Sequence, residues 1–222
     1  MILAGGTINF DSLERDCNRR IPAPNIANLI HCRALDLPRD QVADFKDERV
    51  KAIAALNPVT GAIVGAEGLA DIKIPVLMVG GTSDPATPVV IEQLRAFVWL
   101  GSRDKYLGIL GGQAHVNFDQ LDGSLEVATD LMFTIQRPNQ NSFNRYGNFY
   151  YTAFARVYLS QDESFRPYLQ SGFSQYISQP PNPVHVVHSG ASPALANFFN
   201  QRKPANILPI ISPENSYRTD SP

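Results

Sequence analysis

Three short apolar runs, each closed by glycine or proline, constrain the fold of this chain most. They are residues 50–56, 75–79 and 106–110, followed by Asn-Pro in the first case and by Gly-Gly in the other two. Such runs are typical of strands buried on both faces of a parallel sheet. Between the second and third runs, residues 89–97 carry apolar side chains at helical spacing. The order strand, helix, strand predicts a crossover between neighbouring parallel strands, and therefore an α/β fold.

Composition and charge exclude several classes of protein. Of the 222 residues, 44% are hydrophobic and 18% are charged, with a net charge of −2. This is the composition of an ordinary globular domain rather than of a disordered chain. No basic cluster indicates nucleic-acid binding, and no apolar run approaches the roughly 18 residues of a membrane-spanning helix. From Met1 to Gly6 no signal peptide is visible, because the apolar stretch is too short and lacks a basic start.

Two cysteines, Cys17 and Cys32, lie in a stretch rich in Asn, Pro and Arg. They could be free thiols of a cytosolic protein, or they could form a disulfide that closes a long loop. Closing such a loop is worth about 3 kcal/mol in the chain-entropy model, and it would indicate an oxidising compartment. A zinc site is disfavoured, because the paired C-x-x-C spacing is absent. Localisation therefore stays open: secreted or periplasmic with the disulfide, cytoplasmic without it.

Polar side chains follow the second and third apolar runs. Asp84 comes after the residues GGTS, and His115 comes after GGQA. Both are expected at the carboxyl ends of neighbouring parallel strands, where open α/β sheets build their sites. A carboxylate there can accept the imidazole Nδ1–H and hold the tautomer whose Nε2 takes a proton from a nucleophile. Singly, each has a simpler explanation, since an Asp before Pro85 is usually a turn former. As a pair in this order, they predict a catalytic acid and a catalytic histidine.

The segments ALNP, IPVLMVGGTSD and GGQAH resemble the last three strands of an α/β-hydrolase. More narrowly, the chain resembles the dienelactone-hydrolase-like and platelet-activating-factor-acetylhydrolase-like serine hydrolases of cyanobacteria. The narrower resemblance extends to INFD at residues 8–11, the region of the two cysteines and the aromatic segment near 150–158. It implies a serine-type carboxylic-ester hydrolase acting on a small ester, a phospholipid or another acyl ester. Asp84 would orient His115, which would be general base and then general acid, with no metal and no organic cofactor. The same half-site would serve dehalogenases and C–C hydrolases.

On this resemblance, residues 1–222 form a single incomplete α/β-hydrolase domain, the C-terminal half of the fold with about three parallel strands. Its parts would be a cap-like or lid-like insertion (17–48), the last three strands with the acid and histidine turns (49–118), a helical region (119–178) and a polar, proline-rich tail (179–222). Outside the sheet, we expect a helix end and a loop at 1–16, an extended piece at 184–187, and helices at 145–159, 165–177 and 193–199.

The superfamily pattern also requires a nucleophile elbow, G-x-S-x-G, at a strand-to-helix turn. No serine of the chain lies in that context; Gly190 follows Ser189, but both come after the histidine. We therefore expect the chain to begin just after its own nucleophile, with residues 2–6 as the tail of the nucleophile helix. The oxyanion-hole loop would be missing as well, so the chain as given is expected to be inactive.

A second hypothesis is that the chain is an inactive fragment that acts as a binding or interaction module. Its first strand would be an open apolar edge, which invites self-association. His185 and His188 could be ligands, but two surface histidines in a polar tail are the commoner case. His31, beside Cys32, lacks a clear acid or base partner. The aromatic residues between 143 and 158 are expected mainly to pack a helix, and in a minority interpretation to line an acyl pocket.

Overall fold

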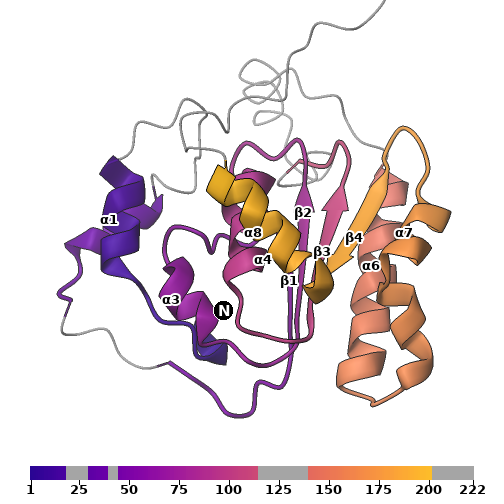
Figure 1. The fold of residues 1–222 in the computed structure, drawn as a ribbon, viewed down its shortest axis with the longest axis horizontal. Coiled ribbons are helices and arrows are strands. Elements are labelled where there is room, and N and C mark those ends of the chain that lie inside the picture. The colour runs from indigo at the N-terminus through magenta and orange to yellow at the C-terminus, as the bar shows by residue number, and fades with distance from the viewer. Residues whose placement is uncertain (19–29, 40–44, 115–139, 202–222) are drawn as a thin grey trace, which may run out of the picture.

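The computed structural model describes residues 1–18, 30–39, 45–114 and 140–201. These residues form a sheet in the order β1-β2-β3-β4 with helices on both faces (Figure 1). The parallel strands are β1 (Ile53–Leu56), β2 (Val76–Gly81) and β3 (Lys105–Leu110). The fourth strand, β4 (Val184–His188), is antiparallel to β3 and falls where an extended piece is predicted. The predicted α/β class is confirmed.

The strands differ in burial. Every residue of β2 is buried, and so are all but one of β3, as expected for central strands with helices on both faces. In β1, by contrast, alternate residues are exposed, and Leu56 keeps 43% of its surface. Burial on both faces is therefore confirmed for two strands and wrong for the first, because β1 lies at the edge of the described sheet.

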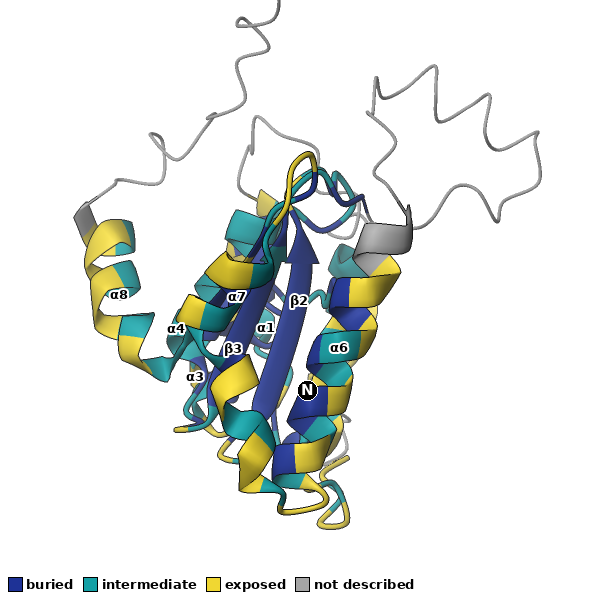
Figure 2. Ribbon diagram, turned by 90° about the vertical axis from the view of Figure 1, so that its right-hand side faces the viewer, coloured by how far each residue is buried: buried dark blue, intermediate teal, exposed yellow. Residues whose placement is uncertain are grey.

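Side chains alternate between the two faces of the sheet, as the pleat of a strand requires. In β2, Leu77 and Val79 join one hydrophobic cluster, while Val76 and Met78 join the other. Figure 2 shows these buried strands between helices that are exposed on their outer sides. The first cluster is covered by α6 (Gln140–Tyr158), and the second by residues of α3 (Gly65–Ala70) and α4 (Arg95–Trp99).

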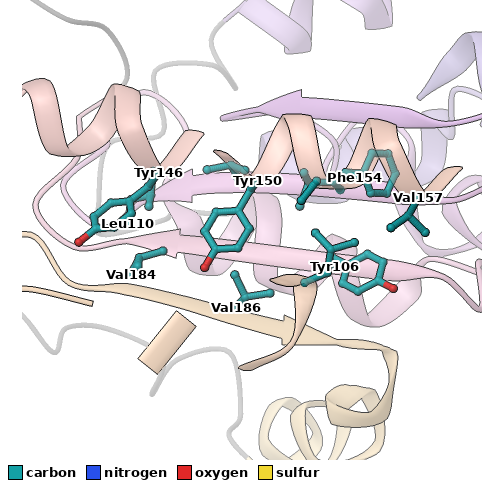
Figure 3. Packing of buried hydrophobic residues seen from close by; sticks show 12 residues of the cluster. Tyr106, Leu110, Tyr146, Tyr150, Phe154, Val157, Val184 and Val186 are labelled. Atoms are coloured by element: carbon teal, nitrogen blue, oxygen red, sulfur yellow. The ribbon is translucent and has the colours of Figure 1, made fainter. Parts of the chain in front are cut away.

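Helix α6 is the aromatic helix predicted over residues 145–159. Tyr146, Tyr150, Phe154 and Val157 recur every three or four residues and form one buried stripe that faces the sheet (Figure 3). Phe154 meets Tyr106 of β3 edge to face, with ring centroids 6.2 Å apart. Helix packing is thus confirmed as the role of these aromatic residues.

The other predicted helices are present with altered bounds. The segment 165–177 is not one helix but a 3₁₀ helix, Glu163–Leu169, followed by α7 (Ser171–Ile177), because Gln170 between them is extended. The segment 89–97 starts as a π-helix, Val90–Leu94, and continues as α4. Helix α8 (Ser192–Gln201) confirms the helix expected at 193–199. None of the described helices is both long and apolar enough to cross a membrane.

Two parts of the prediction were wrong. Residues 1–16 contain the expected stop at Gly5, which is left-handed with φ 96°, but a helix, α1 (Phe10–Asn18), follows instead of a loop. Its start is fixed by Asn9, whose Oδ1 accepts the Ser12 N–H at 2.8 Å. The pair Gly80-Gly81, predicted to close the second strand, lies inside β2. The proposed division into cap, sheet, helical region and tail stays a prediction.

Candidate functional site

The structure places Asp84 where it was predicted, just after the carboxyl end of β2. Its side chain is buried, with 4% of the residue exposed. Oδ1 accepts the backbone N–H groups of Ala86 and Thr87, both at 2.9 Å, and Oδ2 accepts the Thr87 hydroxyl at 2.5 Å. These are the contacts of a turn-forming Asp, so the simpler explanation of this residue holds as well. They also fix the carboxylate rigidly in a buried position.

The turn after β2 is hydrogen-bonded to the turn after β3. The Ser83 N–H donates to the Gln113 carbonyl at 3.0 Å, and the Thr82 N–H donates to the Leu110 carbonyl at 3.0 Å. In the opposite direction, the Gly112 N–H donates to Thr82 Oγ1 at 2.9 Å. We call residues 82–87 the acid turn and residues 111–114 the histidine turn. Their mutual bonds bring the two segments together at one edge of the sheet.

His115 lies outside the described residues. The structure describes the chain up to Ala114, which is 2% exposed and directly precedes the histidine. The Ala114 carbonyl accepts the Gln113 Nε2–H at 2.8 Å. The structure therefore describes the residues that lead up to His115, and the contact of Asp84 with His115 stays a prediction.

The sequence did not single out Asn57, which joins these turns to the end of β1. It is 4% exposed, and its backbone is left-handed with φ 44°. Its Oδ1 accepts the Gly81 N–H at 3.1 Å, and its Nδ2 donates to the Ala114 carbonyl at 3.4 Å. The Asn-Pro pair indicated only that the strand ends here, since a turn signal carries no information on what the side chain reaches.

A second buried carboxylate, Glu92, was also missed. It is fully buried in the π-helix, and its Oε2 accepts the backbone N–H groups of Thr60 and Gly61 at 3.1 and 3.0 Å. Burial lowers the pKa of His31, while the negative charge of Glu92 acts in the opposite direction. The single acidic residue of the helical segment 89–97 was the available signal. Its observed role is to hold the loop after β1.

Among the described residues, the other histidines belong to no group that could hold a metal ion. His185 and His188 both lie on β4, three positions apart and therefore on opposite faces of the strand. His188 Nδ1 accepts the Gly190 N–H at 3.2 Å. Within residues 1–18, 30–39, 45–114 and 140–201, no three His, Cys, Asp or Glu side chains are grouped so that they could hold a metal ion.

Ser192 lies at a strand-to-helix turn, the setting in which a nucleophile elbow is found. It begins α8 just after β4, in the sequence Gly-Ala-Ser-Pro-Ala, which is a strand-to-helix turn. However, β4 is antiparallel, and His188 at its end pairs with Tyr106 near the start of β3. Ser192 therefore lies at the opposite edge of the sheet from Asp84, and it cannot serve the same site.

The two cysteines form a disulfide, Cys17–Cys32, with 5.9 Å between their Cα atoms. It ties α1 to the 3₁₀ helix Cys32–Asp36. One residue before Cys17, Asp16 forms a largely buried ion pair with Arg95 of α4, at 2.7 Å. Together these contacts fix α1 beside the helices that cover one face of the sheet.

Comparison with known proteins gives only distant matches. No protein-family model and no curated protein matches the chain. A cold-adapted esterase from an Arctic intertidal metagenomic library matches with 17% identity and a TM-score of 0.29, over 38% of this chain and 38% of the esterase. The monoacylglycerol lipase of Paleococcus ferrophilus matches with 21% identity and a TM-score of 0.24, over 57% of this chain and 51% of the lipase. At these scores neither match assigns an activity to this chain.

Proposed function

We propose that the chain carries the acid and the base of a serine-type carboxylic-ester hydrolase, with Asp84 as the acid and His115 as the base. The observation that supports this most is the hydrogen bonding between the acid turn and the histidine turn. It brings the segment that bears Asp84 next to Gln113, two residues before His115. Acid and histidine on neighbouring strand ends, in this chain order, are the arrangement of hydrolase triads.

In the proposed mechanism, the Asp84 carboxylate accepts the Nδ1–H of His115. Nε2 of His115 is then the free base that takes the proton of an attacking hydroxyl, and it later returns a proton to the leaving alcohol. The bonds to Ala86 and Thr87 keep the carboxylate oriented before any substrate binds. The pair needs no metal ion for these proton transfers. We assign no serine of this sequence as the nucleophile.

Ester turnover tests this proposal when the substitutions are made at the gene's own locus, so that the protein has the form its cells make. We expect hydrolysis of a short-chain p-nitrophenyl ester to fall at least 100-fold in His115→Ala, since general-base catalysis contributes about that much. Asp84→Asn added to His115→Ala should cost little more, because residues that act as a unit are not additive. A serine-directed phosphonate should abolish turnover. Turnover that resists the phosphonate, or that survives both substitutions, contradicts the proposal.

The exposed edge of β1 supports a second function, in which the sheet pairs with another chain. Leu56 is 43% exposed, and no described strand pairs with the outer side of β1. Exposed apolar edge strands present unpaired backbone groups and are templates for pairing. On this hypothesis the chain is an interaction module, and a second copy of itself is the simplest partner.

A further inference from the structure

We propose that Asn57 is a positioning residue that holds the acid turn and the histidine turn in mutual register. This inference rests on the function proposed above, because it concerns the same pair, Asp84 and His115. Asn57 is given no proton-transfer step of its own in the proposed mechanism. It acts through Gly81, which leads into the acid turn, and through Ala114, which leads into His115.

The backbone of Asn57 shows that the side chain is needed. A left-handed conformation is strained for an ordinary residue, while glycine adopts it freely and Asn tolerates it better than most. Asn57 has φ 44° and is buried, where its amide must find partners. A glycine here would satisfy the backbone at lower cost. Strain of this kind in a buried turn indicates a function of the side chain.

The side-chain bonds of Asn57 reach two strands at once. Its backbone N–H donates to the Val79 carbonyl at 2.7 Å, which fixes the residue against β2. Its Oδ1 then accepts the N–H of Gly81, the last residue of β2, and its Nδ2 points to the Ala114 carbonyl beyond β3. This needs one acceptor and one donor on a short side chain. Asp lacks the donor, and apolar residues lack both.

The two partners of Asn57 lie in the tightest part of the site. A Cβ at Gly81 would be 2.1 Å from the Gln113 carbonyl oxygen, so the two turns touch through bare backbone. The Ala114 carbonyl accepts from Gln113 Nε2 as well as from Asn57. That carbonyl belongs to the peptide bond that leads into His115. Orienting this peptide plane orients the start of the histidine's own backbone.

The measurement that separates positioning from a purely structural role is the coupling of His115 to Asp84. We define this coupling as the change in the NMR titration midpoint of the His115 imidazole caused by Asp84→Asn. In the parent protein, we expect Asp84→Asn to lower the titration midpoint of His115 by about one pH unit, since a neighbouring carboxylate favours the imidazolium. The coupling is measured again in Asn57→Gly, in Asn57→Asp and in Asn182→Ala. Each coupling is a difference between two proteins with the same residue at position 57. The direct effect on the imidazole of the charge added by Asn57→Asp is therefore present in both and cancels.

In Asn57→Gly and in Asn57→Asp, we expect the coupling to be less than half of its value in the parent. Both residues accept a left-handed backbone, so at least one of the two variants should fold with a melting temperature near that of the parent. Asn182→Ala is the matched control. Asn182 Nδ2 donates to the Gly111 carbonyl, at the start of the histidine turn, whereas Asn57 donates to the carbonyl of Ala114 at its end. The coupling in Asn182→Ala should equal that of the parent.

The coupling measurement gives different results if the positioning role is wrong and if the proposed function is wrong. Coupling that is present in the parent and unchanged in a folded Asn57 variant overturns the positioning role and leaves the function standing. Coupling that is absent from the parent overturns the proposed function. A second readout, protection of the Gly81 amide from hydrogen exchange, should fall in Asn57→Gly and persist in Asn57→Asp, which keeps the acceptor. Unchanged protection in Asn57→Gly contradicts the role assigned to Oδ1.

Discussion

The Ser83 N–H donates a hydrogen bond to the Gln113 carbonyl at 3.0 Å, although the two residues belong to turns after different strands. With the bond from Gly112 to Thr82, it makes the acid turn and the histidine turn one unit. Neighbouring parallel strands need not have such bonds beyond their ends, because the ladder stops where the strands stop. The site is therefore built by turn-to-turn contacts added to the sheet.

Gly81→Ala should disrupt this unit. The added Cβ would lie 2.1 Å from a backbone oxygen that no side-chain movement can relieve. We expect the free energy of unfolding to fall by about 1–3 kcal/mol, as overpacked sites do, measured by urea denaturation. Gly172→Ala in α7 is the matched control, since nothing lies within 4 Å of its added Cβ. That change should be neutral or slightly stabilising, and equal effects of the two substitutions would contradict the close contact.

The double substitution Cys17→Ser/Cys32→Ser should destabilise the protein by about 3 kcal/mol, the loop-closure value for a separation of this size. Urea denaturation with and without reductant measures it. Reductant should lower the stability of the parent and leave the double variant unchanged. Two titratable thiols in protein taken from its native compartment would show that the disulfide does not form there.

Lys105 should make stability depend on alkaline pH. Burial lowers the pKa of this lysine to about 8, and its Nζ donates to the Leu100 carbonyl at 2.7 Å. The unfolded side chain keeps its proton up to about 10.5. Between these values the unfolded state binds more protons, so stability rises with pH. Relative to Lys105→Met, the parent should therefore gain stability from pH 8 to 10, and a flat difference would contradict the lowered pKa.

Leu56→Lys tests pairing through the edge of β1. A lysine on an edge strand is a common protection against pairing with another chain. If the chain self-associates through this edge, size-exclusion chromatography should show a concentration-dependent oligomer that Leu56→Lys converts to a monomer. The exposed Leu159, far from this strand in the sequence and 63% exposed, offers a control in Leu159→Lys. A parent that is monomeric at all concentrations contradicts self-association through this edge.

The sheet could be predicted because its signals are local. The central strands are continuous apolar runs closed by glycines, and helix α6 carries its apolar stripe at regular spacing, so each could be identified from a few neighbouring residues. Helix α1 was missed although its capping residue, Asn9, is visible in the sequence, because the segment is short and polar overall. The apolar run alone indicated burial of β1, and its exposure followed only from the hypothesis that the first strand is an open edge.

The candidate site was only partly accessible to sequence reasoning. The position of Asp84 followed from the strand that precedes it. The roles of Asn57 and Glu92 did not, because each depends on contacts with residues at least 24 positions away. Ser192 shows the converse problem, since its strand-to-helix turn suits a nucleophile while the direction of β4 places it at the wrong edge. The roles of such residues follow from the topology of the sheet and not from a local sequence motif.

The central claim is that Asp84 and His115 act as a pair, and the titration of His115 tests it most directly. The NMR titration midpoint of the His115 imidazole is measured in the parent and in Asp84→Asn, with His115→Gln used to assign the signal. Asn has the shape of Asp and can still accept the Ala86 and Thr87 N–H groups, so it removes the charge with little change in the turn. The account predicts that the midpoint falls by about one pH unit when the carboxylate is lost. An identical midpoint in both proteins would contradict it.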